Sequence, residues 1–185
     1  MARQRLRPAW SPEELAQIYA VPHDHRRWPD HNLRVAVTIN VAQWIAGRVV
    51  AQAADLSCGN GAILNAVPAH RRHFGDLAPG YEHTGPIEQT IVDIPHVDMF
   101  VCSETLEHVD DPDLVLKAIR AKANALILST PVDAWGDDNL EHYWAWSRED
   151  VEAMLTGAGF KSMLFTSVDF RPMGLTYCFG IWAAT

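Results

Sequence analysis

The sequence of 185 residues contains no apolar run close to the roughly 20 residues that a membrane-spanning helix needs. Cysteine is scarce, and its three copies lie far apart at Cys58, Cys102 and Cys178. This spacing argues against a disulfide framework and favours a reducing compartment, so we expect a cytoplasmic protein. Arginines occur before residue 8, but no apolar stretch follows them. We therefore expect no secretory signal.

Positive charge is also scarce after residue 50. Residues 51–185 contain 8 Lys and Arg against 19 Asp and Glu, whereas residues 1–50 contain 7 Arg against 4 acids, and the formal net charge is −8. An acidic body does not offer the positive face by which proteins displace counterions from a nucleic acid. We therefore expect a small-molecule substrate, with neither a nucleic acid nor a membrane as partner. The oligomeric state stays open.

The most informative segment is a glycine turn between an apolar run and a helical pattern. The run over residues 49–54 ends in Asp55, small residues occupy 57–61, and apolar residues recur at helical spacing over 62–67. Strand, glycine turn and helix in this order are typical of a nucleotide-binding crossover. Glycine at two positions of the turn lets a ligand lie against the backbone.

A second acid follows at a distance that such crossovers use. Residues 72–76 have the pattern of a short strand ending in Asp76, 21 positions after Asp55. An acid about 20 residues downstream is where the fold places its acceptor for ribose hydroxyls. The alternative is an ordinary turn acid ahead of Gly80.

Two segments together resemble class I S-adenosylmethionine (SAM) methyltransferases, in particular their type-11-like domain. The turn resembles the motif Asp-x-Gly-x-Gly-x-Gly, with Ser57 at the place of the first glycine. The run 97–104 leads into Leu-Glu-His-Val over 106–109 and then into Asp-Asp-Pro over 110–112, as in that family. The resemblance covers roughly residues 35–185.

The resemblance implies an α/β fold with a doubly wound, mostly parallel seven-stranded sheet, an antiparallel terminal hairpin and an N-terminal helical cap. Residues 1–34 would form the tail and cap, and residues 35–185 the SAM-binding domain. Residues 1–9 are expected to fray, and residues 132–146 to form a long loop. The expected helices are 11–19, 33–48, 62–67, 111–122 and 147–157. The expected strands are 49–55, 72–76, 87–91, 97–103, 125–131, 161–169 and 176–183.

The resemblance also assigns residues to the cofactor. Asp55 would lie near the ammonium group of SAM, the turn would offer N–H groups to the carboxylate, and Asp76 would accept from the ribose. Glu88 is the candidate for the adenine, with Asp93 as the alternative, because Pro86 stands near the family's usual acid. The expected cofactor-binding residues are Asp55, Ser57, Cys58, Gly59, Asn60, Gly61, Asp76, Leu77, Glu88, Ser103, Glu104, Thr105 and Leu106.

The acceptor side is expected on the loop after the fifth strand and on the N-terminal segment. His142 and His108 are candidates for a general base, although His108 has an alternative role as a packing residue at a helix start. The expected substrate-binding residues are His23, His25, His31, Trp135, His142 and Tyr143. The N-terminal His and Asp cluster is a lid or acceptor contact, a plain structural feature, or a cation site. Its spacing matches no defined metal motif, so we assign no metal.

These residues predict SAM-dependent methyl transfer to a hydroxyl, carboxyl or amine of a small molecule, such as a sugar or secondary metabolite. Enzymes that methylate exocyclic amines of DNA bases typically carry an Asn/Asp-Pro-Pro-Tyr/Phe run after the fourth strand. Residues 103–106 read Ser-Glu-Thr-Leu instead. The alternatives are a catalytically silent SAM-binding relative and, less favoured, a nicotinamide-dependent oxidoreductase.

Overall fold

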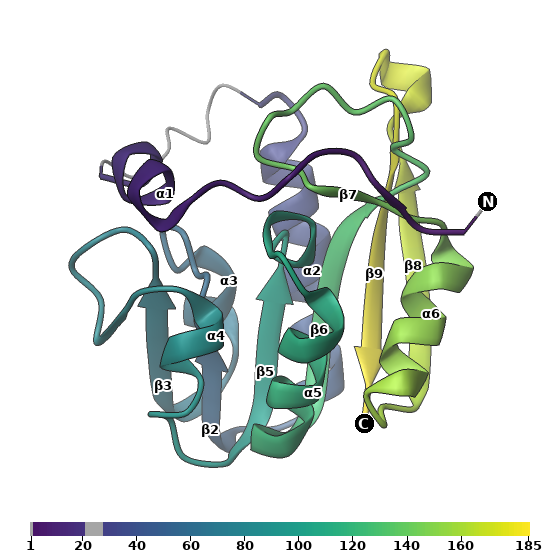
Figure 1. Ribbon diagram of the computed structural model, residues 1–185. Helices are drawn as coiled ribbons and strands as arrows, with labels where there is room; N and C mark the ends of the chain where they lie inside the picture. The colour runs from purple at the N-terminus through teal and green to yellow at the C-terminus, as the bar shows by residue number, and fades with distance from the viewer. Residues whose placement is uncertain (1, 21–27) are drawn as a thin grey trace.

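The computed structural model describes residues 2–20 and 28–185, and these contain a seven-stranded sheet with helices on both faces (Figure 1). The strand order is β4-β3-β2-β5-β6-β9-β8. The pairs from β4 to β6 are parallel, and β9 is antiparallel to both β6 and β8. The strands are β2 Val50–Asp55, β3 Ala69–Asp76, β4 His83–Thr84, β5 Val97–Ser103, β6 Ala123–Val132, β8 Ser162–Asp169 and β9 Cys178–Ala184. The predicted doubly wound sheet with a terminal hairpin is confirmed.

The helices cover the sheet in two groups. They are α1 Pro12–Ile18, α2 His31–Ala46, α3 Ala62–Ala66, α4 Ile87–Thr90, α5 Pro112–Lys122 and α6 Arg148–Gly157, with 3₁₀ turns at Leu106–His108 and Arg171–Met173. Helices α4, α5 and α6 pack on one face, and α2 and α3 pack on the other (Figure 1). None of the described helices is long and apolar enough to cross a membrane.

The composition of β5 explains why it lies in the middle of the sheet. Phe100 and Cys102 are buried in the core under α4, α5 and α6, whereas Met99 and Val101 are buried in the core under α2 and α3. Side chains alternate between the two faces of a strand, so a strand that is apolar at every position is stable only with both faces covered.

The edge of the sheet depends on Gly75. A Cβ atom at this position would lie 2.7 Å from the backbone oxygen of His83, closer than atoms can approach. Glycine therefore allows β4 to lie against the end of β3, where Gly75 pairs with His83 and Asp76 with Thr84.

Two predictions about local structure were wrong, namely the edge strand at residues 87–91 and the frayed tail at residues 1–9. The edge strand expected at residues 87–91 is the helix α4, and the edge strand is β4. Ile87, Ile91 and Ile94 are all buried, and their spacing of four and three residues is that of a helix face. Pro86 precedes the helix, and its carbonyl accepts from the backbone N–H groups of Gln89 and Thr90.

The N-terminal tail is also ordered, which contradicts the expected fraying. Strand β1 Gln4–Arg5 pairs antiparallel with β7 Trp144–Ala145, a short strand inside the expected loop 132–146. Arg3 pairs with Asp113 at 2.6 Å, and the guanidinium of Arg3 lies 5.3 Å from the centre of the Trp144 ring. A pairing of two residues between distant segments leaves no periodic pattern in the sequence.

Candidate functional site

A cleft of about 940 Å³ opens at the carboxyl ends of the parallel strands. Its described walls come from the turn after β2, the segment after β3, the end of β5, the loop 137–143 and the N-terminal segment. The carboxyl ends of strands are where ligands bind in open α/β sheets. In Figure 1, α1 lies over this end of the sheet, above β3.

The turn after β2 is fixed by contacts with its neighbours. Gly59 has a φ angle of +55°, which glycine adopts without a steric penalty. Its N–H donates to Oδ2 of Asp76 at 2.8 Å, and its carbonyl accepts a short hydrogen bond from the hydroxyl of Tyr81. The turn is therefore bound on both sides by the segment that follows β3.

The loop uses most of its own hydrogen-bond donors. The N–H groups of residues 57, 58, 59, 61 and 62 donate to oxygen atoms of Asp55, Gly75, Asp76, Cys58 and Asn60. Our expectation that the loop offers its N–H groups to a ligand carboxylate therefore has little support. Gly61 does not line the cleft among the described residues. A Cβ there would lie 3.1 Å from the Phe74 ring, so this glycine serves packing and a φ of +74°.

Serine at position 57 has a role that glycine would not have. Oγ of Ser57 lies 2.6 Å from Oγ1 of Thr105, and the hydroxyl of Thr105 also donates to the carbonyl of Ser103 at 3.1 Å. These contacts join the turn after β2 to the end of β5. Serine in place of the family's glycine thus adds a hydrogen bond between two walls of the cleft.

Two carboxylates lie at the floor of this half of the cleft. Asp55 is buried, with 2% of its surface exposed, and its Oδ1 accepts from the N–H of Ser57 at 3.0 Å. Burial raises the pKa of Asp55 to about 7, against the lowering effect of the Ser57 hydrogen bonds and with a contribution from the charge of Asp76. The hydrogen bonds of Asp55 within the described residues all reach Oδ1, so Oδ2 can accept from a cationic group of a ligand.

Asp76 is partly engaged by the protein. Its Oδ2 accepts from Gly59 and its Oδ1 from the N–H of Ala78 at 2.9 Å. Each carboxylate oxygen has two acceptor sites, so one remains on each oxygen for a ligand hydroxyl. Cys58 lies nearby, and burial raises the pKa of its thiol to about 12, which keeps it protonated at neutral pH.

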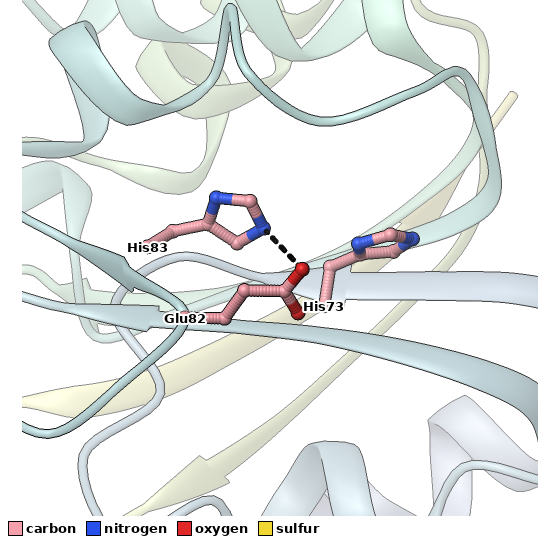
Figure 2. Close-up of side chains that lie close together, drawn as sticks. All are labelled: His73, Glu82 and His83. Atoms are coloured by element: carbon pink, nitrogen blue, oxygen red, sulfur yellow. Dashed lines mark ion pairs between the residues drawn. The ribbon is translucent and has the colours of Figure 1, made fainter.

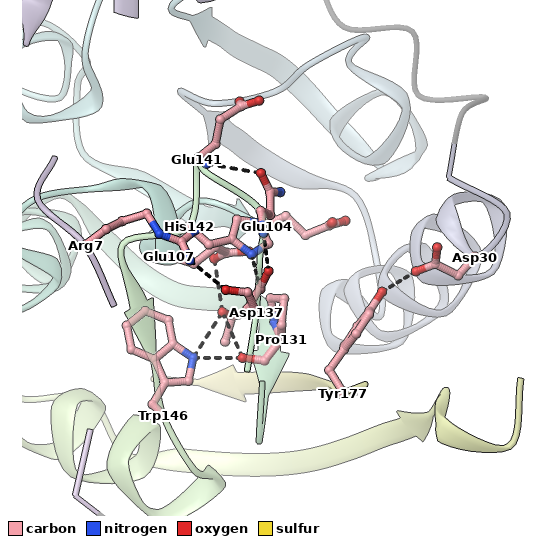
Figure 3. Close-up of polar contacts among 12 residues, drawn as sticks. Arg7, Asp30, Glu104, Glu107, Pro131, Asp137, Glu141, His142, Trp146 and Tyr177 are labelled. Atoms are coloured by element: carbon pink, nitrogen blue, oxygen red, sulfur yellow. Dashed lines mark hydrogen bonds and ion pairs between the residues drawn. The ribbon is translucent and has the colours of Figure 1, made fainter. Parts of the chain in front are cut away.

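A buried ion-pair network lies at the end of β5. Glu104 has a φ of +52°, unusual for a residue with a side chain, and its carboxylate pairs with the guanidinium of Arg34 on α2. Nε of Arg34 lies 2.7 Å from Oδ2 of Asp30, which also accepts a short hydrogen bond from the Tyr177 hydroxyl. Figure 3 shows the end of the Tyr177 side chain meeting Asp30, apart from His142 and Asp137.

The other half of the cleft is built around His142. Nδ1 of His142 lies 2.6 Å from Oδ2 of Asp137 (Figure 3). The ring of His108 meets the ring of His142 edge-on, with the ring centres 4.7 Å apart. Burial lowers the pKa of His142, but the hydrogen bond to Asp137 and the charges of Glu107, Asp137 and Glu141 outweigh it, and the pKa is raised. The result is an oriented imidazole next to the cleft.

Glu107 lies beneath this imidazole. It is 1% exposed, Oε2 accepts from the hydroxyl of Thr130 at 3.0 Å, and burial is the main cause of its raised pKa. Ligand atoms of Glu107, His108 and His142 all lie within 4.8 Å of one another, so this cluster has the donor types for a metal ion. The contact of Nδ1 of His142 with Asp137 leaves Nε2 for a ligand, an arrangement that suits an acid–base pair as well as a metal ligand.

The N-terminal segment covers this half of the cleft. Nε1 of Trp10 donates to the carbonyl of Leu140 at 3.1 Å, and the Tyr19 hydroxyl donates to Oε2 of Glu141 at 2.9 Å. The guanidinium of Arg7 donates to the carbonyl of Asp137 at 2.6 Å. The cover and the loop that carries His142 therefore form one unit.

Most of the predicted site residues line the one cleft. They are His31, Asp55, Ser57, Cys58, Gly59, Asn60, Asp76, Leu77, Glu88, Ser103, Glu104, Thr105, His108, His142 and Tyr143. Leu106 is a correction, because it is fully buried in the core under α4, α5 and α6. Trp135 is half-buried outside the described cleft walls. His23 and His25 lie outside the described residues.

Sequence reasoning did not identify four of the polar residues in the walls. They are Arg34, Tyr81, Asp137 and Tyr177. Asp137 precedes His142 by five residues in a loop, and this spacing has no motif. The signal available for Arg34 was its position in line with the apolar stripe of the expected helix 33–48. It is 6% exposed on α2.

Comparison with known proteins rests on structure alone. No family model matches the sequence, and no curated protein matches it. The structure is similar to 1,6-didemethyltoxoflavin-N1-methyltransferase of Burkholderia thailandensis, solved with 1,6-didemethyltoxoflavin and S-adenosylhomocysteine (SAH), with a TM-score of 0.73 at 18% identity over 96% of this chain and 91% of that chain. It is also similar to the N-methyltransferase NodS of Bradyrhizobium japonicum, solved with SAH, with a TM-score of 0.66 at 14% identity over 93% and 96% of the two chains.

A third similar structure has a different activity. The [4+2]-cyclase SpnF has a TM-score of 0.62 at 13% identity over 79% of each chain. The fold is thus found in proteins that differ in reaction. This chain has the fold of the class I SAM-dependent methyltransferases.

Proposed function

We propose that this protein binds SAM and transfers its methyl group to a small-molecule acceptor. The observation that carries the proposal is the content of the cleft. Its floor holds Asp55 and Asp76 beside a fixed glycine turn, and its opposite wall holds the oriented pair Asp137 and His142. A cofactor with an ammonium group and a ribose suits the first half, and a nucleophile that loses a proton suits the second.

The residues of the first half match the chemical groups of SAM. Oδ2 of the buried Asp55 can accept from a cationic group, which suits the ammonium of the methionyl moiety. Asp76 retains one acceptor site on each oxygen, which suits the two ribose hydroxyls. Glu88 lines the same cleft beyond Pro86, and we assign the adenine to this side. When bound, SAM supplies a methyl group that is already activated on a sulfonium.

His142 is proposed as the general base. Its Nδ1 faces the carboxylate of Asp137, so the N–H donates to that carboxylate and Nε2 carries the lone pair. The acceptor oxygen or nitrogen forms the new bond to carbon as the carbon–sulfur bond breaks, and the acceptor proton passes to Nε2 of His142. Asp137 stabilises the resulting imidazolium, as a carboxylate does for a catalytic histidine elsewhere.

The size and cover of the cleft favour a small acceptor. Its volume of about 940 Å³ is shared between cofactor and acceptor, and the contacts of Trp10 and Tyr19 with the loop 137–143 close it against a macromolecule. We infer a hydroxyl, carboxyl or amine acceptor, such as a sugar or secondary metabolite. The three free cysteines suit a reducing compartment, and we propose a cytoplasmic location.

A catalytically silent SAM-binding relative is the second candidate. The glycine turn uses most of its N–H groups internally and leaves few for a ligand, which favours this candidate. A cyclase with a similar fold favours it too, because the fold alone does not imply methyl transfer. A nicotinamide-dependent oxidoreductase is less favoured, because methyltransferases are the structures that are similar over more than nine-tenths of this chain.

Calorimetric titration with SAM, SAH and NAD separates these candidates. We expect one site per chain for SAM and SAH and no heat with NAD. Asp76→Ala should weaken SAM binding by about 1–3 kcal/mol, since it removes polar partners of both ligand and loop. Glu149→Gln, at an exposed acid of α6 outside the described cleft walls, is the control.

Turnover is then measured on a panel of hydroxyl, carboxyl and amine acceptors. Binding of NAD in place of SAM would overturn the proposal. Tight SAH binding without turnover of any acceptor would favour the silent relative.

A further inference from the structure

A second group of polar side chains lies at the edge of the sheet, outside the described walls of the cleft. It consists of His73 on β3, and Glu82 and His83 at β4 (Figure 2). One ligand-type atom from each residue lies within 4.8 Å of the other two. Figure 2 shows the three side chains converging from the two neighbouring segments, with the carboxylate between the two imidazoles.

His73 is held in the tautomer that a metal requires. It is 1% exposed, and its Nε2 lies 2.9 Å from Oε1 of Gln52 on the adjacent strand. An amide oxygen only accepts, so Nε2 carries the proton and Nδ1 carries the lone pair. Nδ1 is buried and has no hydrogen-bond partner within the described residues. Metal-bound histidines typically show this arrangement, with the other nitrogen donating to an oxygen atom.

His83 also has a nitrogen that the protein leaves unsatisfied. Nε2 is buried without a hydrogen-bond partner within residues 2–20 and 28–185, and it lies 3.8 Å from Oε1 of Glu82, too far for a hydrogen bond. The rings of His73 and His83 are 5.9 Å apart. Two buried imidazole nitrogens without partners are costly, because each loses its contact with water and gains nothing in return.

We propose that His73, Glu82 and His83 bind a divalent transition metal, with Zn²⁺ as the leading candidate. Two imidazoles and a carboxylate are donors that zinc uses, with water in the fourth position of a tetrahedral site. Ligand atoms of tetrahedral zinc lie about 3.4 Å apart, given bonds of about 2.0–2.1 Å. The present separations need only a small contraction, and the exposed Glu82 is free to move inward.

A competing partner for Glu82 is weak. The guanidinium of Arg71 lies 3.5 Å from Oε1 of Glu82, but both side chains are more than half exposed, at 63% and 52%. An ion pair of this kind contributes little, so it does not prevent coordination. The metal would join β3 to β4 at an edge where the ladder has only two paired positions.

The test uses the full-length protein, stripped with EDTA and then freed of EDTA by dialysis. Calorimetry with Zn²⁺ should give one site per chain, and Co²⁺ should give the intense visible absorption of a tetrahedral site. Glu82→Gln and His83→Ala should each weaken Zn²⁺ binding at least tenfold. His70→Ala changes an exposed histidine of the same strand and should bind like the wild type.

Thermal unfolding supplies an independent readout. Zn²⁺ should raise the Tm of the wild type and of His70→Ala, and should not raise it for Glu82→Gln, whose exposed side chain leaves folding intact. Equal Zn²⁺ affinity in wild type, Glu82→Gln and His83→Ala would overturn the proposal. A sulfur-to-metal charge-transfer band with Co²⁺ would also overturn it, because the metal would then lie on cysteine.

Discussion

Asp137 and His142 lie five residues apart on one loop, and Oδ2 of the aspartate is 2.6 Å from Nδ1 of the histidine. This contact fixes the imidazole with Nε2 available to a ligand in the cleft. The N-terminal segment binds the same loop through the carbonyl of Asp137 and the carboxylate of Glu141. The pair is thus held by the tail and by the loop itself.

The first prediction concerns the pH dependence of turnover. A base must be neutral, so turnover should rise with pH through the pKa of His142, which lies above the ordinary value of about 6.5. Asp137→Asn keeps an oxygen that accepts from Nδ1 but removes the negative charge, so the pKa of His142 should fall and the rising limb should move to lower pH. His142→Ala should lower turnover about 100-fold or more and leave SAM affinity within a few fold.

The measurement is kcat against pH at saturating SAM, with Glu149→Gln as the control for loss of an exposed negative charge. An unchanged limb in Asp137→Asn would contradict the role of the pair. A small loss of kcat with a larger KM in His142→Ala would make His142 a binding residue.

The second prediction concerns Asp55 and stability. The folded protein holds the Asp55 proton up to a pKa of about 7, whereas the unfolded chain releases it near the ordinary pKa of 3.8. The folded state therefore binds more protons between these values, and this residue lowers stability as pH rises through that range. Asp55→Asn should stabilise the free protein above pH 7 by up to about 4 kcal/mol, at about 1.4 kcal/mol per pKa unit.

The same substitution should weaken SAM binding, because the amide does not pair with an ammonium. Urea unfolding at pH 4 and pH 8 checks the first effect, and calorimetry checks the second. Glu149→Gln, at an exposed acid outside the described cleft walls, should change neither. A stability gain of equal size at both pH values would show that the charge of Asp55 is not its cause.

The third prediction concerns the glycine turn. Gly59→Val places a branched side chain at a φ of +55° on the wall of the cleft, and SAM should no longer stabilise the protein against heat. Gly80→Val is the matched control, because Gly80 has a φ of +107° but lies outside the described cleft walls, with open space around it. Both variants carry backbone strain, and only the first should lose the ligand. Normal stabilisation of Gly59→Val by SAM would place the cofactor elsewhere.

The parts of the fold that local pattern determines could be predicted from the sequence. Strand β5 is apolar on both faces, and the helices expected at 11–19 and 147–157 are α1 and α6, each preceded by a serine, Ser11 or Ser147, that forms a capping box. The contacts that the sequence did not reveal are non-local. The pairing of β1 with β7 and the bond from Tyr81 to Gly59 join segments whose meeting depends on the finished fold.

Leu106 illustrates a different limit. Its motif suggested a cofactor contact, but the 3₁₀ turn Leu106–His108 directs it into the core and leaves His108 on the wall of the cleft. A motif specifies which residues are present, but the backbone conformation of the short turn determines which of them face the ligand. The sequence did not reveal the proposed metal ligands for a related reason, since His73 and His83 are ten residues apart and meet only across β3 and β4.

The last prediction concerns the N-terminal cover, which we propose acts as a lid over residues 137–143. Deletion of residues 1–20 removes the contacts of Arg7, Trp10 and Tyr19 with this loop, but leaves α2 and the seven-stranded sheet complete. The core should therefore fold, and SAH should dissociate about tenfold faster, because the loop loses the partners that hold it closed.

Stopped-flow displacement of SAH measures the rate, and circular dichroism checks the fold. Tyr19→Phe removes the hydrogen bond to Glu141 and should give a smaller increase, whereas Gln17→Ala, at an exposed position of α1, which Tyr19 caps, should give none. If the deletion variant released SAH and turned over its acceptor at wild-type rates, the segment would be packing on the loop without controlling access to the cleft. A lid predicts that SAH is released fastest by the deletion variant, less fast by Tyr19→Phe, and at the wild-type rate by Gln17→Ala.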